Sequence, residues 1–260
     1  TAGSPGVMPL QRLRRACLWP APPPPRRFDT MARLSRLAVA GQAHLVALLG
    51  HSSQSVFIDD EDRQQFLAAL RESALQQGVA VHAYALLNDR VLLLATPAAD
   101  GALGAMMQGL GRRYGAAFNR RHGRSGSLWA GRYRTAVVQA GVCLQEALLF
   151  VDSQPLADGW APEGAAPRWG SVAHHLGLAR DALVTECSAW WGLGNTPFER
   201  EATFRRLLAE GLPADRRAEL DAAMRQGWAL GDAAFLGQLA QQLDRPVQPR
   251  PRGRPPKSPA

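Results

Sequence analysis

The sequence has no apolar run of about 18 residues, the length that a membrane-spanning helix needs, and no basic-then-apolar order typical of a signal peptide. We therefore expect a soluble, cytoplasmic protein without a membrane partner. It also has only three cysteines, Cys17, Cys143 and Cys187, far apart in the chain. Neither a disulfide framework nor a zinc cluster is indicated, and we expect reduced thiols.

Acidic residues are missing from one long internal stretch. None occurs between Asp100 and Glu146, although the whole chain has 22 acidic residues against 30 Lys and Arg and a net charge of +8. Such an excess of positive charge favours an anionic partner, and charge alone leaves nucleic acid and anionic membrane both open. At 260 residues and 46% hydrophobic content, the chain is long enough for one good-sized domain and an accessory part.

Arginines fill the acid-free stretch, and aromatic rings lie between them. Guanidinium groups bind phosphate oxygens and flat rings stack on unpaired bases, so the pattern predicts a nucleic-acid surface. The alternative is a solvated basic face with no partner. The expected nucleic-acid contacts are Arg112, Arg113, Arg120, Arg121, Arg124, Trp129, Arg132 and Arg134, with Tyr114, His122 and Tyr133 interleaved.

Residues 1–30 are rich in proline, including Pro22–Pro25, and lack apolar periodicity, so we expect a disordered leader and a folded part that begins near Met31. Short apolar runs predict strands at 42–50, 79–87 and 90–96, and a ribbon is expected over 127–139. Helices are expected from Asp59 or Asp60 to Gly78, around a stripe from Leu103 to Phe118, and from 142 to a stop at Pro155. The first of these helices should turn Phe66, Leu67, Leu70 and Leu75 inward.

This order of elements predicts an α+β fold, with helices packed on a mostly antiparallel sheet. Residues 31–160 should form that domain. Residues 161–245 should add a helical extension, with helices near 214–227 and 232–243 and an apolar cluster. The expected members of this cluster are Trp190, Trp191, Phe198, Phe204, Leu207 and Leu208.

Four blocks of sequence resemble the REP-associated tyrosine transposases, which are single-strand DNA transposases. They are HAYALLNDRVLLL at 82–94, FNRR at 118–121, GSLWAGRYR at 126–134 and WGS at 169–171, within a similarity that covers roughly residues 31–177. The resemblance implies a transposase-like domain, a role in DNA transposition and a hairpin or single-stranded DNA end as the partner. It also implies a monomer or homodimer.

In that family two histidines, separated by one hydrophobic residue on a central strand, hold Mg²⁺ or Mn²⁺, and a tyrosine on a later helix attacks the DNA phosphate. The matching positions here are Arg90 and Leu92 for the histidines and Phe150 for the tyrosine, with Gln154 where an assisting amide often stands. Arginine has no free lone pair, and leucine and phenylalanine have no donor atom. The resemblance therefore implies a degenerate member with no catalytic residue and no bound metal or other cofactor.

Two alternative functions remain open, and Arg90 has two possible roles. An active transposase would need a displaced nucleophile such as Tyr84, with His82 or His44 nearby, and a domesticated descendant would bind RNA instead of DNA. In addition, the fixed charge of Arg90 could hold the phosphate that the metal holds in relatives, or Arg90 could simply tolerate exposure.

The end of the chain, 246–260, reads as a disordered basic tail. Its segment RGRP at 252–255 resembles an AT-hook, in which Arg252 and Arg254 would enter a narrow A·T minor groove while glycine lets the backbone approach closely. The alternative is a tail that contributes charge alone.

Overall fold

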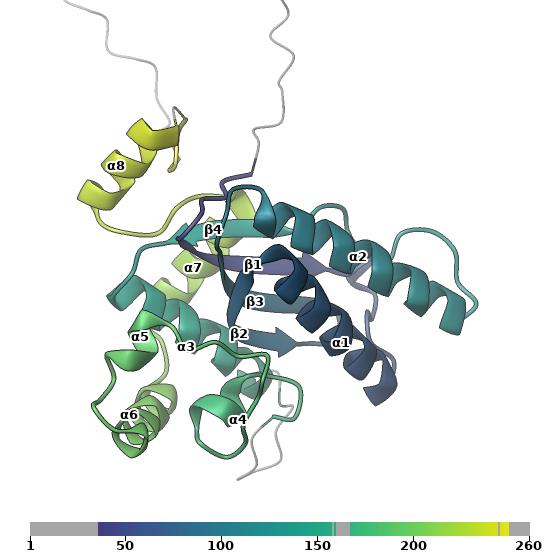
Figure 1. Ribbon diagram of the computed structural model, residues 1–260, viewed down its shortest axis with the longest axis horizontal. Coiled ribbons are helices and arrows are strands. Elements are labelled where there is room, and N and C mark those ends of the chain that lie inside the picture. Colours follow the sequence, from purple (N-terminus) through teal and green to yellow (C-terminus); the bar gives the residue numbers. More distant parts are fainter. Residues whose placement is uncertain (1–35, 158, 160–166, 244, 250–260) are drawn as a thin grey trace, which may run out of the picture. The chain divides into compact units, whose positions relative to one another are not determined.

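The computed structural model describes residues 36–157, 159, 167–243 and 245–249 (Figure 1). The predicted leader, 1–30, and the tail residues Arg252 and Arg254 lie outside these ranges, so the predictions made for them stay predictions. None of the helices in the described ranges is long and apolar enough to cross a membrane. Cys143 and Cys187 are both free thiols.

An antiparallel sheet forms the centre of the described fold, in the order β2-β3-β1-β4. The pairing of β2 with β3 is a hairpin closed at Leu87, whose N–H donates to the carbonyl of Arg90 at 2.9 Å, as the turn residues Asn88 and Asp89 predict. The α+β class is thereby confirmed. The strands are β1 (Ala43–Leu49), β2 (Val79–Leu86), β3 (Arg90–Pro97) and β4 (Arg134–Val138).

Helices α1 (Asp60–Gln77) and α2 (Ala102–Arg121) cover one face of the sheet (Figure 1). Asp59 caps α1 by accepting from the N–H of Asp62, and Gly78 ends it with a left-handed φ of 62°. The stripe predicted for α2, from Leu103 to Phe118, is buried. Leu75 was predicted to face inward, but it is 78% exposed because the buried stripe of α1 runs through Ser73 and Ala74 instead.

The opposite face of the sheet is covered by α3 (Val142–Ala157) together with helices of the C-terminal extension (Figure 1). Pro155 was predicted to stop α3, yet the helix continues past it to Ala157. The extension contains α4 (Val172–His175), α5 (Ser188–Trp191), α6 (Pro197–Glu210), α7 (Ala214–Gln226) and α8 (Ala233–Leu243). Because α3 and the helices α5, α6 and α7 of the extension share one apolar core with the sheet, these three helices form part of this layer.

The apolar cluster predicted for the extension is only partly correct. Trp190 and Phe204 are buried and pack at a tilt against the ring of His175, whereas Trp191 is 54% exposed and Phe198 81% exposed. A smaller third core joins residues from both ends of the described chain, and Val247, inside the range assigned to the basic tail, is buried there. The members of this core are Leu37, Val39, Val137, Ala229, Leu239 and Val247.

Candidate nucleic-acid interface

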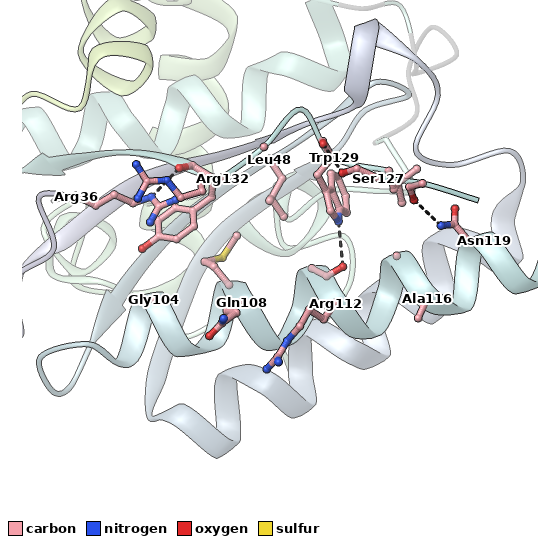
Figure 2. A pocket seen from close by; sticks show the side chains of 17 residues that line it. Arg36, Leu48, Gly104, Gln108, Arg112, Ala116, Asn119, Ser127, Trp129 and Arg132 are labelled. Carbon is pink, nitrogen blue, oxygen red and sulfur yellow. Dashed lines mark hydrogen bonds between the residues drawn. The ribbon is translucent and has the colours of Figure 1, made fainter. Parts of the chain in front are cut away.

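A groove of about 610 Å³ runs between α2 and the loop 126–133, and we call it the α2 groove (Figure 2). Gly104, Gly111 and Gly115 leave the α2 backbone bare along it. The side-chain amide of Asn119 ties the loop to α2 by donating to the carbonyl of Gly126 at 2.8 Å. The loop therefore lies close to a helix surface with few side chains, and the space between them stays open.

Arg112 and Arg132 line the α2 groove from its two sides (Figure 2). Both are exposed, as is Arg120 further along α2, and none of the three forms an ion pair with a carboxylate in the part of the chain that the structure describes. Guanidinium groups in this situation are available to an external anion. These three therefore remain the strongest of the predicted phosphate contacts.

Other predicted contacts are already engaged with acids from α1. Arg113 pairs with Glu72 at 2.5 Å, and Arg121 pairs with Asp59 at 2.7 Å and with Asp62 at 2.6 Å. The hydrogen bond from Arg121 lowers the pKa of the Asp59 carboxyl to about 2. The acid-free stretch of sequence is thus not free of acids in space, because α1 supplies them.

Arg124 and Arg134 are held by neutral partners. Arg124 donates to the side-chain oxygen of Gln54 at 2.5 Å and lies over the ring of Phe118. Arg134 donates to the backbone carbonyl of Arg225 at 3.4 Å, while its side chain lines a different cavity. Both keep their full charge, so both still add to the positive field of this side of the molecule.

Two of the rings predicted to stack on bases are buried in the core. Tyr114 is 1% exposed and donates its hydroxyl to the carbonyl of Val56 at 2.6 Å. Trp129 is 8% exposed and donates its indole N–H to the carbonyl of Gly111 at 3.2 Å. With so little surface exposed, neither ring can stack on a base, and that expectation is wrong. Both rings instead pack together beneath the groove.

A second cavity, of about 710 Å³, lies between β3 and α3, and we call it the β3–α3 cavity. All four positions that align with the catalytic site of the resembled transposases line it. Arg90 and Leu92 alternate along β3, so both face α3, and Phe150 and Gln154 are four residues apart on one side of α3. Arg90 donates to Asp89 at 3.0 Å and to Gln154 at 3.4 Å. The structure therefore brings the four residues together.

The four aligned residues of the β3–α3 cavity do not fit the divalent metal that the resembled transposases hold at these positions. Gln154 offers a single amide oxygen, and Arg90, Leu92 and Phe150 offer no lone pair. Across the described ranges, no group of three or more His, Cys, Asp or Glu side chains is arranged to hold a metal ion. Arginines are frequent in the lining instead, namely Arg90, Arg134, Arg217 and Arg225, against Asp89 and Asp221.

The residues weighed as a displaced active site are bonded within the fold. Tyr84 is 4% exposed and donates its hydroxyl to Asp181 at 2.6 Å, and burial raises its pKa far above the usual value. His82 lies between the carbonyl of Thr185 and the hydroxyl of Thr96, and burial lowers its pKa. A buried phenol with a raised pKa is a poor nucleophile.

Arg36 is a groove residue that sequence reasoning missed. It lines the α2 groove and donates from Nε to the carbonyl of Tyr133, 97 residues away in the chain, at 3.0 Å. No local pattern around Arg36 signals this position, since the contact depends on how the segment before β1 passes the loop 126–133. Arg217 and Arg225 on α7 reach the β3–α3 cavity in the same non-local way.

No protein-family model matches the chain, and no curated protein matches it. Among solved structures, the chain is similar to a REP-associated tyrosine transposase bound to a REP hairpin, with 15% identity, a TM-score of 0.48, and coverage of 61% of this chain and 96% of that one. It is also similar to a putative transposase from Deinococcus radiodurans R1, with 25% identity, a TM-score of 0.31, and coverage of 42% and 84%. Both likenesses are distant, and neither assigns an activity to this chain.

Proposed function

We propose that the chain binds DNA at hairpin or single-stranded ends along the α2 groove and does not cleave the strand. The observation that carries this proposal is the placement of Arg112 and Arg132. Both are exposed, both line one groove, and neither pairs with a carboxylate of the described residues. The sequence resemblance to transposases that act on single-stranded DNA supports DNA as the anion.

Binding is expected to depend on phosphate contacts, because guanidinium groups release condensed counterions when they neutralise phosphates. Arg120 lies eight residues after Arg112 on α2, about 12 Å along the helix axis at 1.5 Å per residue. Arg112 and Arg132 both line the groove, so a strand that follows it can meet more than one arginine, and Arg120 adds an exposed cation outside the groove lining. Arg113 and Arg121 contribute less, since Glu72, Asp59 and Asp62 already neutralise them.

The absence of cleavage is proposed from the side chains of the β3–α3 cavity. Leu92 and Phe150 stand where the resemblance expects a metal ligand and a nucleophile, and neither carries an oxygen or nitrogen in its side chain. Tyr84, the displaced nucleophile considered above, is buried and bonded to Asp181. These residues favour a binding protein over an active transposase.

Fluorescence anisotropy with a labelled DNA hairpin and a labelled single strand tests the binding. The double variant Arg112→Ala/Arg132→Ala should weaken binding at least tenfold and lower the slope of log K against log salt by about 1.4, which is about 0.7 for each single-strand phosphate that is no longer neutralised. The matched control is Arg113→Ala/Arg206→Ala, which removes the same charge from arginines paired with Glu72 and Glu210. Equal losses in both variants, or no binding by the wild type, would overturn the proposal.

Two further measurements address the alternatives. Incubating the protein with a hairpin strand and Mg²⁺ or Mn²⁺ should leave the strand intact, and a nicked product or a covalent protein–DNA adduct would show an active transposase. An RNA hairpin of matched sequence should bind no more tightly than the DNA hairpin. Clearly tighter binding of the RNA would favour the RNA-binding alternative, because the 2′-hydroxyl is the group that distinguishes the two backbones.

A further inference from the structure

Tyr133 is a ring of the arginine-rich stretch that still borders the α2 groove without being buried. Tyr114 and Trp129 are core residues, and His122 is held by its Nε2 at 3.0 Å from the carboxylate of Asp62. Tyr133, in contrast, is half-buried and lines the groove. The chain has only three tyrosines, and the other two donate their hydroxyls to internal acceptors.

Arg36 fixes the position of the Tyr133 ring. The guanidinium carbon of Arg36 lies 4.1 Å from the ring centroid, a stacking distance, and its Nε donates to the Tyr133 backbone carbonyl at 3.0 Å. On the α2 side, the Tyr133 phenol lies beside Gly104, since a Cβ added there would be in ordinary van der Waals contact with the hydroxyl oxygen at 3.7 Å. Two planar groups are thus stacked and held beside the groove.

We propose that the stacked pair of Tyr133 and Arg36 is a binding site for one unpaired nucleobase of a strand whose phosphates lie on Arg112 and Arg132. This inference rests on the proposed DNA binding and names what the α2 groove recognises beyond phosphate. An unpaired base stacks favourably on aromatic rings and on guanidinium planes, whereas the base of an intact duplex keeps its faces against its neighbours.

The charges around the pair fit such a ligand. Arg132 precedes Tyr133 in the chain and Arg112 lies across the groove, so phosphates on either side of a stacked base would meet a cation. Burial raises the pKa of the Tyr133 hydroxyl, so the phenol stays neutral next to phosphate. Because stacking reads the face of a base and not its edge, the site should accept all four bases.

The test compares two labelled single strands of equal length, one complete and one with a run of abasic positions in its centre. Both carry the same phosphates, so their affinity ratio isolates the contribution of the bases. The wild type should bind the complete strand about tenfold more tightly, the gain typical of one stacked base. Tyr133→Leu should bring the ratio close to one, while Tyr133→Phe, which keeps a ring, should retain it.

Because the ratio is measured within one protein preparation, a partly unfolded variant changes both affinities equally. Thermal unfolding of Tyr133→Leu should be cooperative, which confirms that the variant is folded. A wild-type ratio near one, or a ratio that Tyr133→Leu leaves unchanged, would overturn the base site while the weaker binding of Arg112→Ala/Arg132→Ala still supports DNA binding. If neither strand binds the wild type, the proposed function itself fails.

Discussion

Arg90 on β3 donates a hydrogen bond to the side-chain oxygen of Gln154 on α3, at 3.4 Å. The bond crosses the β3–α3 cavity, and Leu92 and Phe150 line the same cavity. The strand and the helix therefore bring these positions together across the cavity. The side chains that they carry are a cation (Arg90), an aliphatic group (Leu92) and a phenyl ring (Phe150). Replacing only the side chains tests whether the backbone still places these positions as a metal site would need them.

The double variant Arg90→His/Leu92→His should bind Zn²⁺ or Co²⁺ with micromolar affinity, whereas the wild type should bind neither at this site. Alternate residues of a strand point the same way, so both imidazoles would face α3 with Gln154 opposite. Isothermal titration calorimetry with Zn²⁺ measures the affinity, and Co²⁺ absorption reports the coordination.

The single variant Leu92→His is the control for this experiment, because it adds one imidazole at the same buried position. If the double variant binds Zn²⁺ no more tightly than Leu92→His does, Arg90 and Leu92 do not face a common point. Circular dichroism of both variants checks that an imidazole in place of the buried leucine leaves the fold intact.

Local patterns in the sequence were enough to predict β1, β2, β3 and the first two helices, whereas the ribbon predicted over 127–139 is a strand only at Arg134–Val138 and a loop before it. Asp59 and Gly78 fix the ends of α1 because capping depends on neighbouring residues alone. Period-two alternation placed Arg90 and Leu92 on one face in the same way. In contrast, Leu75 was misplaced, since both Ala74 and Leu75 are apolar and only packing against the sheet decides which of them is buried.

Which arginines and rings of the groove region are accessible was harder to predict, because accessibility depends on contacts between distant segments. The lack of acids near Arg113 and Arg121 in sequence suggested free cations, but α1 brings Glu72, Asp59 and Asp62 to them. The prediction that Tyr114 and Trp129 stack on bases was wrong for a similar reason. A tyrosine or tryptophan fits a core and a base platform equally well by composition, and only burial separates Tyr114 and Trp129 from Tyr133.

Arg121 should be a stability residue more than a DNA contact. It joins the end of α2 to the start of α1 through Asp59 and the buried Asp62. Arg121→Ala should lower the free energy of unfolding clearly more than Arg112→Ala does, since the buried carboxylate of Asp62 loses one partner while His122 still holds it. Urea unfolding followed by circular dichroism measures the difference.

Arg112→Ala is the matched variant, on the same helix and with the same loss of charge. It should change the unfolding free energy by less than about 0.5 kcal/mol, as is usual for exposed side chains without partners. Arg121→Ala should therefore lose mainly stability, and Arg112→Ala should lose mainly DNA affinity. Equal stability of Arg121→Ala and Arg112→Ala would contradict the structural role.

His44 should make the fold less stable in mild acid. It is fully buried on β1, where Nε2 accepts from the N–H of Val39 at 3.1 Å and Nδ1 donates to the carbonyl of Gln42 at 2.8 Å. Burial lowers its pKa from about 6.5 to about 4. The neutral ring is thus favoured by folding, and its contribution is complete above pH 6.5 and lost as the pH falls from 6.5 to 4.

The loss across this window should be about 3 kcal/mol, because each unit of pKa difference corresponds to about 1.4 kcal/mol. Urea unfolding of the wild type and of His44→Gln between pH 4 and pH 7 measures it. The variant cannot titrate at this position, so its stability should fall less steeply with decreasing pH. His82 also has a lowered pKa, but it is common to both proteins and cancels in the comparison. Parallel curves would show that His44 is not the responsible group.

Asp152 should be one of the most sensitive buried positions of the fold. Its carboxylate on α3 accepts from the hydroxyl of Ser171 at 2.5 Å and from Nδ1 of His175 at 2.6 Å, and Ser171 in turn accepts from the backbone N–H of Tyr84 at 2.9 Å. The side chains of Asp152, Ser171 and His175 are almost completely buried, so the network joins α3, β2 and α4 away from water. Asp152→Asn keeps the shape but turns one acceptor into a donor, which should cost about 2–4 kcal/mol.

Urea unfolding of Asp152→Asn should show a lower midpoint with an unchanged slope, which indicates lost stability without a change in the surface exposed on unfolding. Asp215→Asn, an exposed position in the first turn of α7, makes the same chemical change and should cost no more than about 1 kcal/mol through the helix dipole. DNA affinity of folded Asp152→Asn should equal that of the wild type, because the network lies apart from the residues of the α2 groove. A midpoint shift no larger than that of Asp215→Asn would mean that the Ser171 and His175 side chains do not depend on a shared carboxylate.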